Sequence, residues 1–257
     1  GAQAGDGFGG VPGVSIATAS AYAETLAAAG VEVDRQRRAT TIRAAVETAA
    51  AALQARPDLP QELFDELTDL VEAPLLIEGS VPESYLALPA EVLSTVMRAH
   101  QRYIPLYRQQ AQIDPLALDA RASLLPTFLC IANSLPAATD TVRRGNERVL
   151  KARLADAAFF VAADRAVASS DRRAQLARVT FAEGLGSLLN RVERLEWCTD
   201  GLVELLELGD QDAAHARRAA HLCKHDLVSQ MVGEFPELQG VMGGKYLLAE
   251  GEPRPVA

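Results

Sequence analysis

A short apolar run at residues 125–132 most constrains the fold of this sequence. It is far shorter than the ~20 apolar residues of a membrane-spanning helix, and it has the length of a buried strand. Residues 146–167 follow it with apolar side chains at helical spacing. The residues expected on the inward face of this helix are Val149, Leu150, Leu154, Ala158 and Val161. A strand followed by an amphipathic helix predicts a mixed α/β unit.

The same spacing rules predict the elements around this pair. Gly30 is placed to end a short first helix, Asp34 to cap a helix over 35–56, and Pro60 to open the next one. Short apolar runs at 75–77, 85–88 and 103–107 predict strands. Residues 91–100 are expected to form a helix, and the polar residues 108–123 a connecting loop.

After residue 169 the pattern becomes almost purely helical, with expected helices at 185–208, 211–223 and 225–234. We therefore predict the α+β class: a flexible Gly-rich tail at 1–15, an α+β domain at 16–168 and an all-helical domain at 169–257. No apolar run is long enough to span a membrane. The three cysteines have no paired spacing, which argues against a disulfide framework or a four-cysteine zinc site.

Charge is distributed unevenly along the chain. The net charge is -9, yet residues 98–153 carry nine basic and four acidic side chains. Clustered positive charge attracts phosphates even on an acidic molecule. Arginine supplies 22 of the 25 basic residues and suits bidentate phosphate contacts. An Arg-rich genome is the alternative explanation for this count.

The first basic cluster lies where the expected helix 91–100 gives way to a strand. Arg98, His100 and Arg102 surround this junction. They could contact a phosphate or a partner's carboxylate, or they could complement the negative end of the helix dipole.

The second basic cluster surrounds Gly145 and Asn146. Arg144, Arg148 and Lys151 fall at i, i+4 and i+7 and share one helix face. The cluster could bind an RNA backbone. Alternatively, Glu147 could pair with Lys151, and Asp156 with Arg153 or Lys151, to give a solvated, salt-bridged face.

A third cluster holds His221, His225 and Asp226, which are weak candidates for metal ligands. The two histidines share a helix face, and an adjacent His-Asp pair is typical of metal-dependent phosphohydrolases of the HD type. Such a site needs a further Asp downstream, and no Asp follows Asp226. Packing or partner contact is the alternative role. The sequence also has no phosphate-binding Gly-rich loop ending in Gly-Lys-Ser/Thr and no Gly-x-Ser-x-Gly motif of a serine hydrolase. Cys130 lies in an apolar segment and is expected to be a core residue.

Several strings in the same order resemble the beta subunit of bacterial-type glycyl-tRNA synthetase, from about residue 16 to 252. They are LVEAP (70–74), LPAEVL (88–93), MRAHQRY (97–103), IAN (131–133), GNERVL (145–150), ARLADA (152–157), TFAEGLGS (180–187), KHDL (224–227) and MVGEFPELQGVMG (231–243). The family commonly has Ala where His225 stands.

The resemblance implies a central domain like that of phenylalanyl-tRNA synthetase beta chains, followed by a truncated, degenerate HD-like helical domain. It implies a tRNA-binding, non-catalytic segment of an ATP-dependent glycine–tRNA ligase, with no self-contained active site. The glycine, ATP and Mg site belongs to a separate alpha chain, so no cofactor is expected here. The implied partners are tRNA-Gly and the alpha subunit in a hetero-oligomer, without DNA or membrane. The implied location is the cytoplasm, with an organellar stroma or matrix left open.

The basic clusters and the resemblance together give one set of candidate tRNA-binding residues. They are Arg98, His100, Arg102, Arg144, Asn146, Arg148, Lys151, Arg153 and Lys224. Two other functions remain open at this point. One is a structural or interaction module that derives from the synthetase but has lost aminoacylation, and the other is an HD-type phosphohydrolase.

Overall fold

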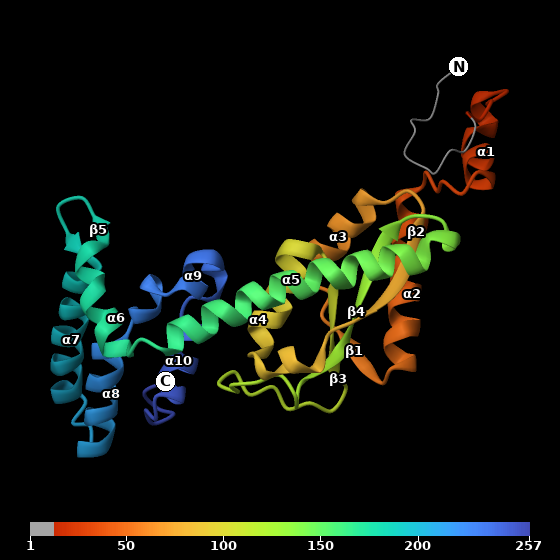
Figure 1. Ribbon diagram of the computed structural model, residues 1–257. Helices are drawn as coiled ribbons and strands as arrows, with labels where there is room; N and C mark the ends of the chain where they lie inside the picture. The colour runs from red at the N-terminus through yellow and green to blue at the C-terminus, as the bar shows by residue number, and fades with distance from the viewer. Residues whose placement is uncertain (1–12) are drawn as a thin grey trace. The chain divides into compact units, whose positions relative to one another are not determined.

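The computed structural model describes residues 13–257 (Figure 1), so most of the expected tail at 1–15 lies outside the described residues. The described chain forms two compact units. The first contains the residues up to Leu86, Leu93–Gln112 and Arg121–Leu154, and the second contains Ala87–Val92, Ile113–Ala120 and Ala155–Ala257. The α+β class is confirmed. The expected domain boundary near residue 168 stays a prediction, because compact packing does not by itself define a folding domain.

The first unit is built on a four-stranded antiparallel sheet with the order β1-β3-β4-β2. Its strands are β1 (Ala55–Pro57), β2 (Pro74–Ser80), β3 (Ile104–Arg108) and β4 (Leu124–Asn133). The expected apolar strand is β4, which lies inside the sheet and pairs with all of β2. The register of β3 against β4 shifts between Pro105 and Tyr107, where the proline has no N–H to donate.

Alternate residues of β4 face opposite sides of the sheet. Leu129 and Ile131 join the core formed with α2 (Arg35–Ala52) and α3 (Gln61–Leu70). Cys130 faces the other side, where it accepts a hydrogen bond from Asn146 of α5 (Thr139–Arg165). The sheet therefore has a helical layer on each face (Figure 1).

The helix ends of the first unit follow the expected local chemistry. The carboxylate of Asp34 accepts hydrogen bonds from the N–H groups of Gln36 and Arg37 and so caps α2. Gly30 has a positive φ of 84° just after η1 (Ala19–Ala21) and α1 (Tyr22–Ala28). Pro60 precedes α3. The expected helix 91–100 forms as α4 (Ala90–Thr95) and a π-helical turn, η3 (Val96–His100). The expected loop lies between β3 and β4.

Four expectations for this half of the chain were wrong. Residues 85–88 are not a strand: η2 (Glu83–Ala87) is a 3-10 helix, in which the N–H of Tyr85 bonds back to the carbonyl of Pro82. The first long helix ends at Ala52 and is followed by β1 rather than continuing to residue 56. Helix α5 begins at Thr139 after η4 (Pro136–Ala138), because Gly145 continues the helix instead of interrupting it. Val149 of α5 is 44% exposed and does not face inward.

The second unit is mainly helical, but the segment expected to be all-helical also contains a short two-stranded hairpin. Its elements after α5 are α6 (Ser169–Gln175), η5 (Leu176–Arg178), β5 (Thr180–Ala182), β6 (Gly186–Ser187), α7 (Leu188–Leu205), α8 (Asp210–Leu222), η6 (His225–Val228), α9 (Gln230–Glu234), η7 (Pro236–Leu238) and α10 (Val241–Ala249). Helices α7 and α8 are antiparallel and are joined by Asp200–Arg217 at 2.7 Å and Glu196–His221 at 2.6 Å.

Two boundaries in this unit differ from the expectation. The helix expected from residue 185 begins at Leu188, because Gly184 and Gly186 adopt positive φ and form the β5–β6 hairpin. The helix expected at 225–234 is two helices, η6 and α9, because the Ser229 side chain caps α9 by accepting from the N–H of Val232. No helix in residues 13–257 is both long enough and apolar enough to cross a membrane.

Candidate nucleic-acid interface

The outward face of α5 carries a row of basic side chains. Leu150 and Leu154 are buried on its inward face, with 1% and 0% of their surface exposed. Arg144, Arg148 and Lys151 lie together on an exposed side of the helix. We call these three residues the α5 basic row. Their spacing places three positive charges within two helical turns, on the scale of neighbouring phosphates along one nucleic-acid strand.

The acidic residue inside this row is engaged elsewhere. The Glu147 carboxylate accepts hydrogen bonds from the Ser80 N–H at 2.9 Å and the Ser80 hydroxyl at 2.8 Å. The alternative in which Glu147 pairs with Lys151 is therefore wrong, because Glu147 turns to the end of β2. Asp156 also fails to form its expected pair with Arg153 or Lys151. Within residues 13–257, the α5 basic row and Arg153 make no ion pair.

Asn146 and Arg153 flank the row but do not extend it. The Asn146 amide donates a hydrogen bond to the Cys130 sulfur at 3.1 Å, so this side chain turns toward the sheet. Burial, the larger effect, raises the pKa of the Cys130 thiol to about 11, while the bond from Asn146 opposes that rise. Arg153 is exposed, and it lies about 140° around the helix from Arg148. The three residues of the α5 basic row therefore share one exposed side of the helix, and Arg153 lies apart from them.

The cluster at Arg98, His100 and Arg102 differs from the α5 basic row because both of its arginines form ion pairs. Arg98 pairs with Asp58 at 3.3 Å, and Arg102 pairs with Glu66 at 2.5 Å. His100 lies between them in the π-helical turn and is half-buried. Arg102 adopts a positive φ of 56°, which turns the chain from the helix into β3. Carboxylates from outside this turn therefore neutralise its two arginines. These partners have no local signal in the sequence, because they lie 40 and 36 residues away.

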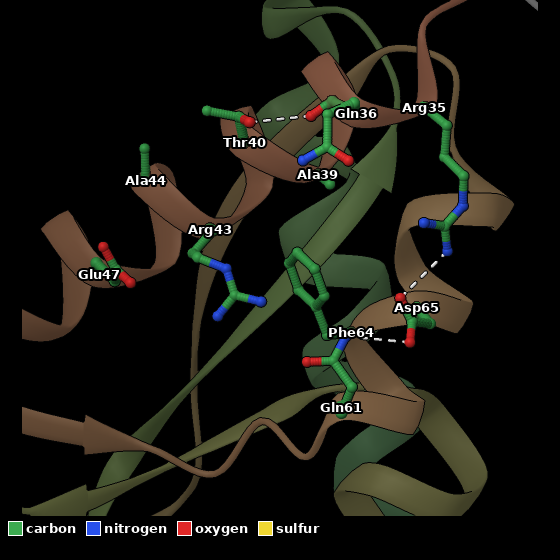
Figure 2. A pocket seen from close by; sticks show the side chains of 10 residues that line it. All are labelled: Arg35, Gln36, Ala39, Thr40, Arg43, Ala44, Glu47, Gln61, Phe64 and Asp65. Atoms are coloured by element: carbon green, nitrogen blue, oxygen red, sulfur yellow. Dashed lines mark hydrogen bonds and ion pairs between the residues drawn. The ribbon is translucent and has the colours of Figure 1, made fainter.

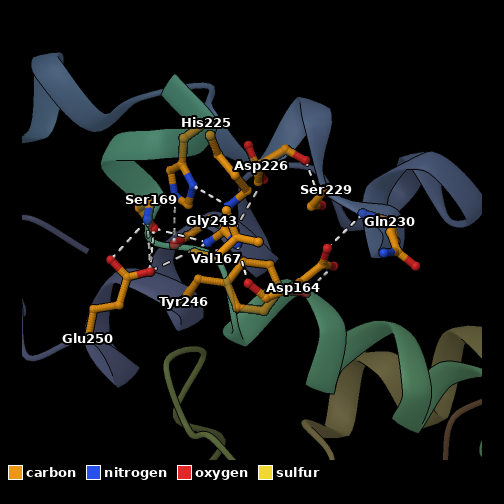
Figure 3. Close-up of polar contacts among 11 residues, drawn as sticks. Asp164, Val167, Ser169, His225, Asp226, Ser229, Gln230, Gly243, Tyr246 and Glu250 are labelled. Atoms are coloured by element: carbon orange, nitrogen blue, oxygen red, sulfur yellow. Dashed lines mark hydrogen bonds and ion pairs between the residues drawn. The ribbon is translucent and has the colours of Figure 1, made fainter. Parts of the chain in front are cut away.

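The remaining candidates lie in the second unit, where Figure 3 shows a network of buried polar side chains. His225 is 1% exposed and lies between two groups. The Arg172 guanidinium donates to its Nδ1 at 3.3 Å, and its Nε2 lies 3.3 Å from the carbonyl oxygen of Gly243. These partners assign the neutral tautomer with the proton on Nε2. Burial and, next, the charge of Arg172 lower the pKa of His225.

Asp226 and His221 also make hydrogen bonds, but with different partners. The Asp226 carboxylate accepts from the backbone N–H groups of Gly240 and Gly243 and so holds the start of α10. His221 pairs with Glu196, which also receives two hydrogen bonds from Arg173. Lys224 adopts a left-handed conformation before η6. The described part of the chain contains no group of three or more His, Cys, Asp or Glu side chains placed to hold a metal ion.

Arg172 is the member of this network that the sequence did not single out. It is 2% exposed, and its guanidinium donates to the carbonyl oxygens of Asp164 and Val167 and to the Ser169 hydroxyl. It also lies 4.7 Å from the centre of the Tyr246 ring. A buried arginine of this kind joins four segments of the second unit, and a contact pattern over this range has no local sequence signature.

Known proteins resemble this chain over most of its length. The family model described as "Glycyl-tRNA synthetase beta subunit" matches residues 4–257. The chain is 42% identical over 244 residues to the glycine–tRNA ligase beta subunit of Acaryochloris marina, which covers 95% of this chain and 33% of the relative. It is 43% identical over 244 residues to that of Acidithiobacillus ferrooxidans, with the same coverage. For Desulforudis audaxviator the identity is 42% over 242 residues, or 94% of this chain and 34% of the relative.

These matches first define a class, the subunits of aminoacyl-tRNA synthetases. The chain belongs to the glycyl-tRNA synthetase beta subunit family. It spans about a third of the length of the curated relatives that it matches.

Proposed function

We propose that this chain is a tRNA-binding, non-catalytic part of a glycine–tRNA ligase, which positions tRNA-Gly for aminoacylation by an alpha chain. The observation that carries the proposal is the α5 basic row. Three exposed cations share one helix face without ion pairs in the described structure. Because a cation that already pairs with a carboxylate gains less from a phosphate, unpaired cations are the ones expected to bind RNA.

The other clusters support the non-catalytic part of this proposal. Nothing in the polar network of the second unit offers a free nucleophile or general base, since His225 and Asp226 hold α10. In the proposed function the alpha chain supplies the glycine, ATP and Mg site, and this chain requires no cofactor. A hetero-oligomer with that alpha chain in the cytoplasm, or in an organellar stroma or matrix, is part of the same proposal.

Arg98, His100, Arg102, Asn146, Arg153 and Lys224 have a secondary place in the proposal. Arg98 and Arg102 need to release Asp58 and Glu66 before they can bind phosphate. Asn146 supports the helix from inside. Arg153 is unpaired, but it lies about 140° around the helix from Arg148 and does not share the face of the row. We rank the α5 basic row first, because its three cations are unpaired and lie on one face, and expect these six residues to contribute less.

The test is a salt series of binding to tRNA-Gly, with a second tRNA for comparison. Affinity should fall with salt at a log–log slope of about -3 for three phosphate contacts, and Arg148→Glu should reduce this slope by about 1. Arg37→Glu is the matched control, because Arg37 lies on α2, its side chain is 74% exposed, and its replacement changes the net charge equally. A preference for tRNA-Gly over the second tRNA would add identity reading to backbone contact.

Two results would count against the proposal. One is a flat salt response, and the other is equal slopes for the wild type and Arg148→Glu. Either result would favour a structural or interaction module that has separated from aminoacylation.

A further inference from the structure

A groove on the first unit lies between α2 and α3, away from the residues assigned above. It has a volume of about 480 Å³, within the range of small-ligand sites. Figure 2 shows Arg35, Gln36, Thr40 and Arg43 entering it from α2, and Gln61 and Phe64 from α3. The ring of Phe64 belongs to the hydrophobic core and is 5% exposed. The groove thus has a rigid aromatic base and polar walls.

Arg43 is the central side chain of this groove. Its guanidinium carbon lies 4.1 Å from the centre of the Phe64 ring, so the cation rests on the aromatic face. Within residues 13–257 Arg43 makes no ion pair, and the residue is exposed. A guanidinium held against a ring is preorganised, and its outer face is a platform on which a second planar group can stack.

Arg35 closes one end of the groove and is already neutralised. Its Nε lies 2.7 Å from Asp69 and its Nη2 lies 3.2 Å from Asp65. The Gln61 amide donates to Asp65 at 3.0 Å. That bond and the one from Arg35 lower the pKa of Asp65. In the described structure, the side-chain carbonyl oxygen of Gln61 and the side-chain amide of Gln36 make no hydrogen bond, so both are available to a ligand.

The charge of the groove restricts the ligand. Two carboxylates, Glu47 and Asp65, share the lining with Arg35 and Arg43. A run of phosphates or an acidic peptide would meet these carboxylates inside the groove. A neutral, planar group with hydrogen-bonding edges instead fits the stacking surface and the two amides. A nucleobase has this chemistry, and unstacked RNA bases are recognised by arginine planes and side-chain amides.

We propose that this groove receives one unpaired base of a bound RNA, which stacks on the Arg43–Phe64 pair while its phosphates stay outside. The inference rests on the proposed RNA-binding function and names a second element of recognition on the same unit. The α5 basic row holds the backbone without regard to pairing, whereas the groove distinguishes unpaired from paired RNA.

Arg43→Lys separates stacking from charge, because lysine keeps the positive charge and lacks the flat surface. The experiment uses the full chain, a single-stranded RNA with one 2-aminopurine, and a blunt RNA duplex with the same number of phosphates. Arg43→Lys should weaken single-strand binding by about five-fold or more, leave duplex binding unchanged and abolish quenching of the 2-aminopurine emission. Arg37→Lys, on the same helix outside the groove, should change none of these.

The outcomes separate this inference from the proposed function. If the wild type binds both RNAs but the 2-aminopurine emission is not quenched, the groove inference is overturned and the α5 basic row still stands. If Arg43→Lys behaves as the wild type while Arg43→Ala does not, charge alone is responsible and stacking is overturned. If a glutamate-rich peptide binds in place of RNA, the groove is a peptide site. If neither RNA binds, both proposals fail.

Discussion

The carboxylate of Glu147 on α5 accepts two hydrogen bonds from Ser80, the last residue of β2. This contact determines that the cations of the α5 basic row are unpaired. Had Glu147 stayed on the outer face of the helix, it would have neutralised Lys151 one turn away. Bound to Ser80, it anchors the helix to the sheet and leaves the cations of the row unpaired.

Glu147→Ala should therefore lower stability without lowering affinity for RNA. The loss of hydrogen bonds to a partly exposed carboxylate should reduce the free energy of unfolding by about 1 kcal/mol. Removal of a negative charge beside the row should leave tRNA binding equal or stronger. Urea unfolding and the salt series measure the two effects. A clear loss of affinity in the folded variant would mean that Glu147 itself contacts the RNA.

Gly79→Ala should destabilise the first unit strongly. A Cβ at Gly79 would lie 2.3 Å from Cζ of Phe128, whose ring stacks on Tyr103 at 4.6 Å between centroids. Because the ring is held in the core, we expect a loss of about 1–3 kcal/mol in urea unfolding.

Gly145→Ala is the matched control for that change. Gly145 lies inside α5, and a Cβ there would have no neighbour within 4 Å. Alanine is the better helix former, so this variant should gain up to about 1 kcal/mol. Equal losses for the two variants would contradict the account of Phe128 as the specific obstacle.

Acidification should weaken the second unit through His225. Its folded-state pKa is lowered by burial first and by Arg172 next, against opposing effects of Asp226 and Glu250. The unfolded chain therefore takes up this proton first as the pH falls. The stability contributed by neutral His225 is present above its ordinary pKa of 6.5 and is lost as the pH falls below it.

The comparison is between the wild type and His225→Gln across this pH range. The difference in their free energies of unfolding should shrink as the pH falls, because the wild type alone loses stability through this group. Chemical denaturation at several pH values measures it. Parallel curves would show that His225 has the same pKa in the folded and unfolded chains.

The three thiols should react at different rates. Cys198 is exposed, whereas burial raises the pKa of Cys130 to about 11 and also raises that of Cys223. Because the thiolate is the reactive form, a thiol reagent at about pH 8 should label Cys198 rapidly and Cys130 only after unfolding. Mass spectrometry of digested protein locates the label. Rapid labelling of Cys130 in the folded chain would contradict its place between β4 and α5.

Local chemistry explains which parts of the fold could be predicted from the sequence. The buried strand β4 and the Asp34 cap of α2 depend on adjacent residues, and both were predicted. The segment at 85–88 has strand-like composition, but it follows Pro82 too closely and curls into a 3-10 turn. Glycine has low helix propensity, so a helix beginning after Gly145 is the expectation, yet packing of α5 on the sheet overrides this preference.

The candidate site was predictable only in part for the same reason. The spacing of Arg144, Arg148 and Lys151 placed them on one face, which needs no long-range information. Whether those charges are paired depended on Ser80, which lies 67 residues before Glu147. The partners of Arg98 and Arg102 are likewise remote in sequence, as is the packing of Arg43 on Phe64. A single sequence carries no local signal for such contacts.

The buried Lys245 of α10 bears on how this protein can evolve. Its ammonium pairs with Glu91 at 3.0 Å and donates to the carbonyl oxygen of Ala117 at 2.6 Å, and both partners come from short segments far upstream in the chain. No single breakpoint in the gene can therefore transfer the second unit whole. Recombination that moved only residues 155–257 would leave a lysine buried without its partners, so the two units are expected to be inherited together.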